Sequence, residues 1–436
     1  MPSVKNNSPE SVIIIGGGAA GLMAAYELSK HKIHVTVIEA KNRLGGRIRT
    51  THNTSFSKPV EEGAEFIHGD LPLTLSLLDE AGIRYHAIND KMYRLEKGKF
   101  KKENNFTEHW NMLMKQMASL KQDMPIAVFL DTFFSNDKYA ELQTSIKNFA
   151  GGFDLADIST ASTKALYHEW SEEMGTQYRI DEGYKKLVNY LEAKCKTNGC
   201  VFSLSCCAKK INWHKNEVNV LTMCSRMYKA NKVIVAVPVS VLQADINSAD
   251  YLEFNPFIPQ HIQAAGNIGF GAVIKIVLEF SENFWNEKKK DAGFIFTNEE
   301  VPTWWTQLPE QNNILTGWLG GEKALAVKDE TDEAILNKAI MSLSGAFDIS
   351  TNKLHEQLRA SKIANWCKEP DINGGYSFHT IESVEAKHIL RQPVDDTVFF
   401  SGEALFEGIP GGTVEAALQS GKKTAYAILK NLSITA

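Results

Sequence analysis

The start of the chain has two short apolar runs separated by a glycine-rich turn and an amphipathic stretch. Ser11–Ile15 is a β-branched run that ends at glycine, which predicts a buried strand. From Ala19 to about His31 the apolar residues fall near one face, which predicts a helix. A second strand is predicted over His34–Ile38, with Glu39 directly after it. The pattern therefore predicts a strand–helix–strand unit.

The glycines between the first strand and the helix have an informative spacing. Gly16, Gly18 and Gly21 form the pattern G-x-G-x-x-G, and Glu39 follows Gly21 by 18 residues. In such a unit the first glycine makes the turn, the second admits a pyrophosphate at the helix N-terminus, and the third lets helix and strand pack closely. The acid can accept hydrogen bonds from ribose hydroxyls. This order favours dinucleotide binding over a purely structural glycine turn.

A later apolar run contains one lysine. Ala272–Phe280 predicts a strand that is apolar on both faces apart from Lys275. A buried ammonium group is costly unless it is paired or neutralised, which makes Lys275 a candidate functional residue. The alternative is an edge strand whose lysine extends to water. Further along, the pattern predicts a strand over Ile314–Leu319 and a helix over Asp332–Ala346.

Length, composition and charge narrow the function classes. The chain has 436 residues, 43% of them hydrophobic, and a formal net charge of −5, which argues against a nucleic-acid partner. No apolar run reaches the length of about 18 residues that a membrane span needs. With its polar start MPSVKNNSPE, the chain is expected to be soluble and cytoplasmic, without a membrane partner. The six cysteines lack metal-finger spacing, so free thiols and no metal site are predicted.

The segment after the second strand, EAKNRLGGRIRT, is similar to the flavin amine oxidase family. Other segments resemble the same family in the same order along the chain: VEEGAEFIHG (60–69), DEGYKKLVNYL (181–191), KVIVAVPVSVL (232–242), GFGAVIKIVLEF (269–280) and FFSGEALFEGIPGGTVEAALQSGKKTAYAIL (399–429). The resemblance implies FAD as the cofactor. It also implies an α/β fold, in which an FAD-binding, Rossmann-like layered domain is joined to a substrate domain of mixed sheet flanked by helices.

The family-like segments are interleaved with stretches richer in aromatic residues and in varied helical patterns, which indicates two discontinuous domains with a ligand site in the crevice between them. We expect the FAD-binding domain to comprise 1–75, 182–250 and 366–436, and the substrate domain to comprise 76–181 and 251–365.

The resemblance also implies particular site residues. The residues expected to contact the cofactor are Gly16, Gly18, Ala20, Gly21, Glu39, Gly45, Gly46, Arg47, Gly63, Ala64, Glu65, Phe66, Ala208, Gly402, Glu403, Thr413 and Val414. Lys275 matches the lysine that contacts flavin N5 through a water. His68 matches a histidine near the active site of polyamine oxidases, although a loop histidine with no such role is an open alternative. Tyr376 and Thr413 match the two walls of the family's aromatic cage.

Two of these positions depart from the monoamine oxidase pattern. Gly375 stands where those enzymes have the cysteine that binds the flavin covalently, so the resemblance implies non-covalent FAD. Thr413 replaces the second cage tyrosine, which leaves Trp304 or Trp305 as an alternative wall, with core packing as the other interpretation.

The expected reaction is the oxidation of an amine to an imine, which water hydrolyses, with dioxygen reduced to hydrogen peroxide. Glu169, Glu172 and Glu173 could hold the distal ammonium of a polyamine, although a solvated helix face is favoured. One alternative is an L-amino-acid oxidase, in which Arg179 or Arg226 would bind the carboxylate. Others are a flavin desaturase or isomerase, and a non-catalytic flavoprotein.

Overall fold

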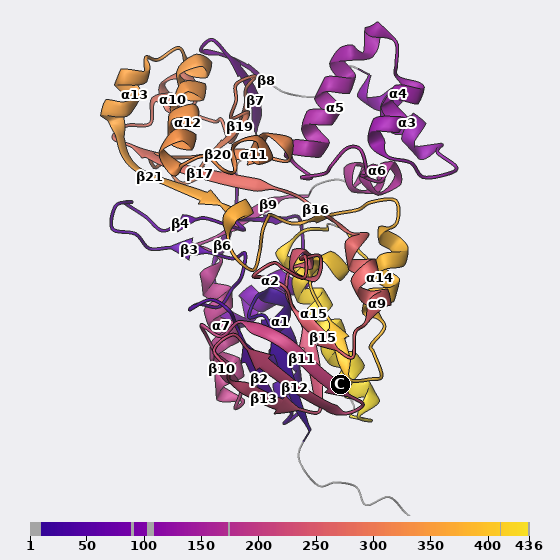
Figure 1. Ribbon diagram of the computed structural model, residues 1–436. Coiled ribbons are helices and arrows are strands. Elements are labelled where there is room, and N and C mark those ends of the chain that lie inside the picture. Colours follow the sequence, from indigo (N-terminus) through magenta and orange to yellow (C-terminus); the bar gives the residue numbers. More distant parts are fainter. Residues whose placement is uncertain (1–9, 89–90, 103–108, 173–174, 410, 435–436) are drawn as a thin grey trace, which may run out of the picture. The chain divides into compact units, whose positions relative to one another are not determined.

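The computed structural model describes residues 10–88, 91–102, 109–172, 175–409 and 411–434 (Figure 1). They divide into two compact units, each assembled from separated parts of the chain. Unit 1 comprises Met1–Arg47, Lys185–Asn267 and Glu385–Ala436. Unit 2 comprises Ile48–Tyr184 and Ile268–Val384.

Unit 1 is built on a parallel sheet with the strand order β10-β2-β1-β14-β23. Its strands are β1 (Ser11–Ile15), β2 (His34–Ile38), β10 (Val201–Ser203), β14 (Lys232–Val235) and β23 (Val398–Phe400). All four neighbouring pairs run parallel, and Val12 in β1 lies between Val35 and Lys232. Because parallel neighbours need a crossover connection, the first two strands are joined by helix α1 (Ala19–Lys30). The predicted strand–helix–strand unit is confirmed.

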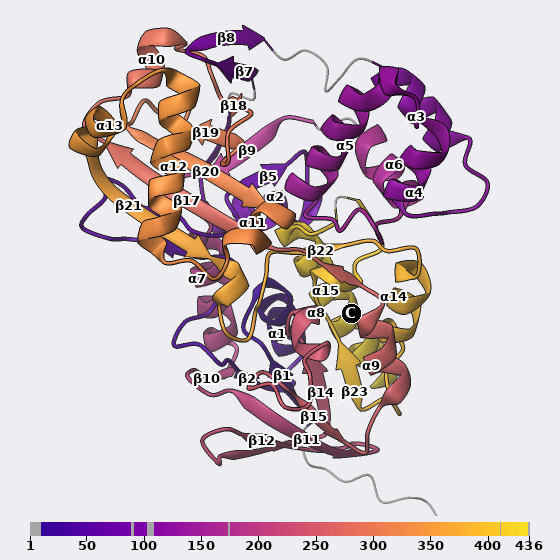
Figure 2. The same ribbon diagram turned by 45° about the horizontal axis from the view of Figure 1, so that its top comes forward.

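Helix α1 packs closely against α15 (Val414–Asn431), and the two lie side by side in both ribbon views (Figures 1 and 2). Glycine permits the close approach, because a Cβ atom on Gly421 would lie 2.2 Å from the carbonyl oxygen of Ala20. Two helices far apart in sequence are thereby held together. The other helices of unit 1 are α7 (Lys185–Thr197), α8 (Val239–Leu242) and α9 (Pro259–Gly266), and α14 (Ser383–Arg391) begins at its boundary.

A second, smaller sheet in unit 1 has the order β13-β12-β11-β15. Its strands are β11 (Ala208–His214), β12 (Glu217–Thr222), β13 (Met227–Ala230) and β15 (Glu253–Asn255). Residues 223–226 form the turn between β12 and β13, and this turn packs beside the loop that precedes β11, since the amide of Met223 donates to the carbonyl of Cys207.

Unit 2 contains a mixed sheet with the order β21-β17-β20-β19-β18-β7-β8. Its strands are β7 (Met92–Glu96), β8 (Lys99–Lys102), β17 (Val273–Phe280), β18 (Phe294–Phe296), β19 (Thr303–Thr306), β20 (Ile314–Gly320) and β21 (Leu358–Asn365). Strand β17 is antiparallel to a neighbour on each side, and all eight of its residues are buried. This position explains its continuous apolar pattern, and it shows that the alternative of an edge-strand lysine is wrong.

Helix α12 (Asp332–Phe347) packs on the mixed sheet, as Figure 2 shows. Its apolar face, including Ile335, Ala339 and Leu343, shares a core with Ile274 and Ile276 of β17. A separate core joins four further helices: α3 (Trp110–Ala118), α4 (Ile126–Phe133), α5 (Ala140–Gly152) and α6 (Thr163–Ser171). Short helices also occur: α2 (Pro72–Ala81), α10 (Phe284–Lys288), α11 (Glu322–Val327), α13 (Thr351–Gln357), η1 (Asp137–Tyr139) and η2 (Trp366–Lys368).

Three small sheets complete the described part of unit 2. One has the order β5-β9-β6, formed by β5 (Phe66–His68), β9 (Gln177–Ile180) and β6 (Tyr85–Ala87). The other two pair β3 (Thr50–Thr51) with β4 (Val60–Glu61), and β16 (Gly269–Phe270) with β22 (Ser377–Phe378). These strands hold the segment 60–69 beside β9, which sets up the buried charges described below.

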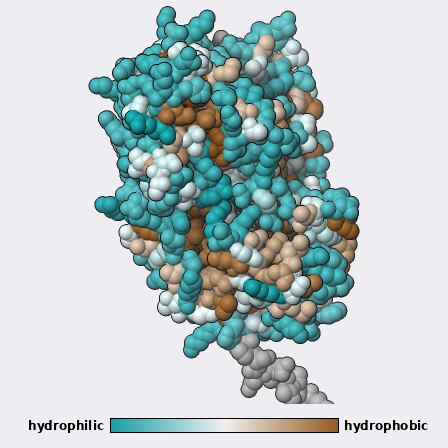
Figure 3. Space-filling view, turned by 60° about the vertical axis from the view of Figure 1, so that its left-hand side comes forward, coloured by the Kyte–Doolittle hydropathy of each residue, from teal (hydrophilic) through white to brown (hydrophobic). Residues whose placement is uncertain are grey.

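Hydrophilic side chains predominate on the molecular face shown in Figure 3, where hydrophobic ones form small, separate patches. In the described part of the chain, no helix is both long enough and apolar enough to cross a bilayer.

Candidate active site

The glycine turn after β1 has the geometry of a cofactor cradle. Gly16 adopts a positive φ of 106°, and a Cβ atom there would lie 2.5 Å from the carbonyl oxygen of Ala236. A Cβ on Gly21 would lie 2.0 Å from the carbonyl oxygen of Gly16. Gly18, at the N-cap of α1, instead faces open space, since a Cβ atom there would have no neighbour within 4 Å. The turn is therefore tight at its first and third glycines and open at the second, at the N-terminus of a helix, where an anion is favoured.

Glu39 braces this turn. Its carboxylate is buried and accepts hydrogen bonds from the backbone amides of Gly17 (2.7 Å) and Lys41 (2.8 Å). Gly45 reinforces the same turn, because its amide donates to the carbonyl oxygen of Gly17 at 2.9 Å. The structure thus brings together the glycine motif, Glu39 and Gly45 around one loop.

The remaining residues of unit 1 that are expected to contact the cofactor lie near the ends of helices and strands. Arg47 forms an ion pair with Glu403, with Nη1 2.7 Å from Oε1, and Glu403 is buried. Thr413 is the N-cap of α15, and its hydroxyl accepts from the amide of Ala416 at 3.1 Å. Other candidates occupy similar positions: Gly46 after the second strand, Ala20 in the first turn of α1, Ala208 at the start of β11, Gly402 before the short helix η3 (Glu403–Leu405), and Val414 at the start of α15.

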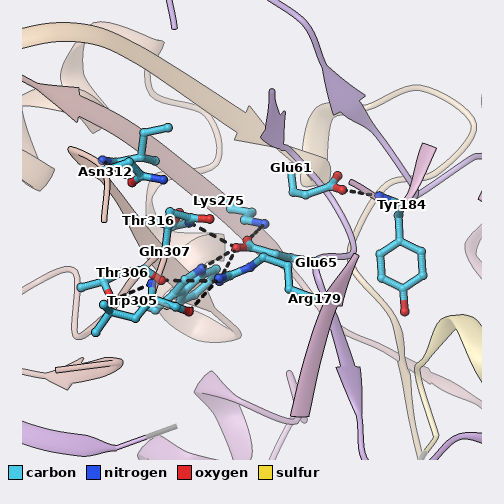
Figure 4. Close-up of polar contacts among 12 residues, drawn as sticks. Glu61, Glu65, Arg179, Tyr184, Lys275, Trp305, Thr306, Gln307, Asn312 and Thr316 are labelled. Carbon is cyan, nitrogen blue, oxygen red and sulfur yellow. Dashed lines mark hydrogen bonds and ion pairs between the residues drawn. The ribbon is translucent and has the colours of Figure 1, made fainter. Parts of the chain in front are cut away.

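In unit 2, Lys275 forms a buried ion pair (Figure 4). Its Nζ lies 2.6 Å from Oε2 of Glu65 and donates to the carbonyl oxygen of Gly63 at 3.1 Å. Only 1% of the lysine side chain and 4% of the glutamate side chain are exposed. The lysine therefore meets the condition for a buried ammonium, namely a paired and hydrogen-bonded charge.

Glu65 also engages a second cation. Its Oε1 accepts from Nη2 of Arg179 (2.8 Å), Nε1 of Trp305 (3.2 Å) and Nε2 of Gln307 (3.3 Å), as Figure 4 shows. Burial by itself raises the pKa of this carboxyl, but the charges of Lys275 and Arg179 outweigh it and lower the pKa to about 2. Both oxygens of Glu65 are thus committed to protein partners, and Glu65 holds Lys275 in place.

Arg179 is neutralised by this arrangement. Besides its ion pair with Glu65, its guanidinium lies 5.0 Å from the ring centroid of Phe66 and donates to the carbonyl oxygen of Leu308 at 3.3 Å. Arg226, the other arginine considered for binding a substrate carboxylate, is exposed in the turn between β12 and β13. Neither arginine therefore has the setting of a buried carboxylate receptor.

Glu61 is a second, partly buried carboxyl near this pair. It accepts from the amide of Tyr184 at 2.6 Å and from the hydroxyl of Thr50 at 3.0 Å. Burial raises the pKa of Glu61 to about 7, although the Tyr184 amide and the charge of Lys275 act in the opposite direction. Glu61 therefore changes charge near neutral pH. Its local sequence gives no sign of this behaviour, which arises from partners distant along the chain.

His68 and Tyr376 lie among aromatic and apolar side chains of unit 2. The Nδ1 atom of His68 is buried without a hydrogen-bond partner, and the ring lies 6.0 Å from that of Phe66 and 6.5 Å from that of Phe153. Burial lowers the pKa of His68 to about 4, so the ring is neutral at ordinary pH. The Tyr376 hydroxyl donates to the carbonyl oxygen of Phe153. His68 and Tyr376 thus both contact Phe153.

Gly375 sits in a tight position. A Cβ atom there would lie 2.5 Å from Leu155 Cδ1 and 2.8 Å from Val273 Cγ1. No side chain fits at this position without repacking of these two residues.

The tryptophans have different roles. Trp304 is fully buried in the core and donates to the carbonyl oxygen of Val301, so core packing is what the structure shows for it. Trp305 is buried and donates to Glu65. Trp318 is directly opposite Lys275 in β20, is partly exposed, and lies 5.9 Å from the ring of Trp305. Trp318 was not among the predicted site residues, because its neighbour on the adjacent strand is not visible from local pattern.

The acidic segment does not form one cluster in the described residues. Glu172 is exposed, and Glu173 lies outside the described residues. Glu169 lies near Asp154, which accepts a hydrogen bond from Nε1 of Trp170 at 2.9 Å. Burial, and then the charge of Glu169, raise the pKa of Asp154 well above its usual value.

Comparison with known proteins decides the family. The family model described as flavin containing amine oxidoreductase matches residues 19–429. The chain belongs to this family. The flavin-containing amine oxidoreductase assignment confirms the resemblance found in the sequence.

Curated relatives of this flavin-containing amine oxidoreductase include lysine-specific histone demethylase 2 of Homo sapiens, which is 28% identical over 97% of this chain and 54% of that protein. Polyamine oxidase 2 of Arabidopsis thaliana is 25% identical over 97% of this chain and 88% of that protein. The chain spans about half the length of the histone demethylases it matches first.

Solved structures share the fold. A putrescine oxidase bound to putrescine has a TM-score of 0.80 at 20% identity, over 97% of this chain and 99% of that chain. Cyclohexylamine oxidase from Brevibacterium oxydans has a TM-score of 0.79 at 19% identity, over 98% of this chain and all of that chain (100%). These likenesses confirm the predicted α/β fold, with a parallel Rossmann-like sheet and a mixed sheet in the second unit.

Proposed function

We propose that this flavin-containing amine oxidoreductase is an FAD-dependent amine oxidase, with a small-molecule amine and dioxygen as its substrates. The observation that carries the proposal is the buried Lys275 on the central strand β17, at the position where the family resemblance puts a flavin-facing lysine. A buried ion pair adds little net stability compared with apolar side chains in the same place, so a functional role is the better account of this lysine.

Unit 1 is proposed to hold the dinucleotide. The open face at Gly18 suits a pyrophosphate at the N-terminus of α1, and Glu39 suits the ribose hydroxyls. Arg47 and Glu403 are proposed to lie along the cofactor, and the backbone at Thr413 and Val414 to contact it. Gly63, Ala64, Glu65 and Phe66 of unit 2 are proposed for the segment near the flavin ring, with Glu65 acting through Lys275, which it holds in place.

The cofactor is proposed to be non-covalent. Gly375 stands at the position of the tethering cysteine, and glycine has no side chain that could bind the flavin. Flavin should therefore leave the protein on acid or heat precipitation. Flavin that stays with the precipitate after washing in denaturant would contradict this part of the proposal.

Bound FAD would supply the redox chemistry, accepting a hydride equivalent from the amine carbon and passing the electrons to dioxygen to give hydrogen peroxide. The chain's own contribution is charge and orientation. Lys275, fixed by Glu65, is proposed to place a positive charge where negative charge develops during the reduction of dioxygen. His68 is neutral, and with Tyr376 and Trp318 it is proposed to line the path of an uncharged amine.

An amine is favoured over an α-amino acid. Binding a carboxylate in an apolar site needs a cation that is not already neutralised, whereas Arg179 is paired with Glu65. The relatives named polyamine oxidase, putrescine oxidase and lysine-specific histone demethylase suggest the panel to test: polyamines, diamines, simple monoamines and peptides with a methylated lysine.

The test is anaerobic bleaching of the flavin absorption band by each candidate, followed by peroxide release in air. Bleaching by amines but not by amino acids is the expected result. Bleaching by amino acids alone would favour the amino-acid oxidase alternative. Bound flavin that no candidate reduces would favour a non-catalytic flavoprotein.

A further inference from the structure

Two cysteine thiols in unit 1 lie in contact. The Sγ atoms of Cys206 and Cys224 are 3.9 Å apart, although the residues are separated by 18 positions. Cys206 lies in the loop between β10 and β11, and Cys224 lies at the tip of the turn between β12 and β13. All six cysteines are free thiols, as predicted. A disulfide bond needs sulfur atoms about 2.05 Å apart, so the exposed turn would have to move Cys224 toward Cys206 for the bond to form.

The two thiols have complementary surroundings. Cys224 is exposed, whereas Cys206 is buried, with 1% of its surface accessible. The Thr222 hydroxyl lies 3.2 Å from the Cys224 sulfur. That hydroxyl, the amide and charge of Arg226 and the neighbouring thiol lower the pKa of Cys224 below its usual value. An exposed thiol with a stabilised thiolate beside a second thiol has the features of a redox-sensitive pair.

The buried partner is attached to the cofactor cradle. The amide of Cys206 donates to the carbonyl oxygen of Glu39 at 2.9 Å, and the amide of Ser205 donates to the carbonyl oxygen of Lys41 at 2.8 Å. The carboxylate of the same Glu39 holds the amide of Gly17 in the glycine turn. A bond between Cys206 and Cys224 would therefore tie the turn between β12 and β13 to the segment that carries Glu39.

We propose that Cys224 and Cys206 form a reversible disulfide when the protein meets a hydroperoxide, and that this bond clamps the turn between β12 and β13 onto the Glu39 segment. The oxidant class, hydrogen peroxide, is the product of the proposed function, so the source of peroxide rests on that function. The reaction at the two thiols does not depend on that function, because hydrogen peroxide from any source can oxidise them.

The reaction balances in two steps. The Cys224 thiolate attacks one peroxide oxygen, the O–O bond breaks, and the other oxygen leaves as water after taking a proton, which leaves a sulfenic acid on Cys224. The Cys206 sulfur then attacks the Cys224 sulfur, the S–S bond forms, and the S–O bond breaks. The hydroxyl leaves as water with the proton from Cys206. The two sulfurs are oxidised by two electrons in total, and one peroxide is reduced to two waters.

The test adds hydrogen peroxide to the purified, FAD-loaded protein and needs no amine substrate. Peptide mapping under non-reducing conditions should find a 206–224 link, with a mass lower by two hydrogens, and a thiol titration in denaturant should fall from six per chain to four. The link should be lost in Cys224→Ser and in Cys206→Ser. It should survive in Cys207→Ser, the neighbouring thiol, and in Cys367→Ser, a thiol of unit 2.

The clamp has a second readout. The oxidised protein should unfold at a temperature about 5 °C higher than the reduced protein, because the link restricts the unfolded chain. Dithiothreitol should reverse the shift, and Cys224→Ser should never show it. The proposal is overturned by unchanged thiol content, by Cys224 that oxidises further without linking, by a covalent dimer through Cys224, or by a link that leaves the unfolding temperature unchanged. Because peroxide is supplied, an enzyme that oxidises no amine can still pass this test.

Discussion

Nζ of Lys275 lies 2.6 Å from Oε2 of Glu65, and both side chains are almost completely buried. Arg179 shares the same carboxylate through Oε1, so two cations meet one anion in a region shielded from water. Burial raises the pKa of the nearby Glu61 to about 7, and the charges of Lys275 and Glu65 also act on it, in opposite directions. The charge state of unit 2 near Lys275 is therefore set by four residues that act together.

Lys275→Met should lower oxidase turnover by roughly 10- to 1000-fold, since an electrostatic term near 3 kcal/mol is removed. The methionine keeps a similar length. Glu65 retains Arg179, Trp305 and Gln307 as partners, so the fold and the FAD content should survive. Stopped-flow reduction by an amine and reoxidation by dioxygen, measured separately, should place most of the loss in reoxidation. Parent-like turnover in a variant that binds FAD would make the lysine purely structural.

Glu65→Gln should destabilise the protein by about 3 kcal/mol, because it leaves two buried cations without their anion. We therefore expect the Glu65→Gln variant to unfold at a lower urea concentration than the parent at pH 7. Glu279→Gln is the matched control: Glu279 lies on the same strand as Lys275 and is buried, but its carboxylate accepts from the backbone amide of Ser57, which the amide oxygen of glutamine can replace. If the two variants lost equal amounts of stability, the Lys275–Glu65–Arg179 cluster would have no special role in stability.

We expect the free energy of unfolding to depend on pH because of Glu61. Its folded-state pKa, about 7, is raised above the ordinary value of 4.5 by burial, so the folded protein binds the proton more tightly than the unfolded chain. The stabilisation from this group is fully present below about pH 4.5 and is lost as the pH rises through about 7. The loss should approach about 3 kcal/mol.

Urea unfolding of the parent and of Glu61→Gln at pH 5 and pH 8 checks this expectation. Glutamine can still accept from the Tyr184 amide, so the two proteins should have similar stability at pH 5, and the variant should be the more stable at pH 8. Parallel pH profiles for the two proteins would show that Glu61 does not titrate in this range.

Glu39→Ala should weaken retention of FAD. The substitution removes the proposed ribose acceptor and also the brace on the amides of Gly17 and Lys41. Flavin absorbance after gel filtration in cofactor-free buffer measures the loss. Glu253→Ala, which breaks an ion pair with Lys210 elsewhere in unit 1, should keep its flavin. Full occupancy of Glu39→Ala at low free FAD would contradict the assigned role.

Local pattern was enough to predict the strand–helix–strand unit, the buried strand around Lys275 and the helix that begins at Asp332, because their hydrophobic periods lie within one element. The partners of Lys275 cannot be predicted from local sequence pattern. Glu65 was assigned to the cofactor from the resemblance alone, and its ion pair joins segments far apart in sequence. Trp318 and Arg179 likewise acquire their neighbours only when strands pair.

The separation of 210 positions between Glu65 and Lys275 has a consequence for how the protein folds. Closing the sheet around β17 before the 60–69 segment arrives would leave an ammonium group in a dry core without a counterion, and that intermediate is heavily penalised. The two segments are therefore expected to dock together, late and cooperatively, after a large loop has been closed. A fragment containing the β17 sheet but lacking residues 60–69 should consequently remain loosely packed, with fast amide hydrogen exchange along β17, while the intact chain protects that strand as strongly as any other.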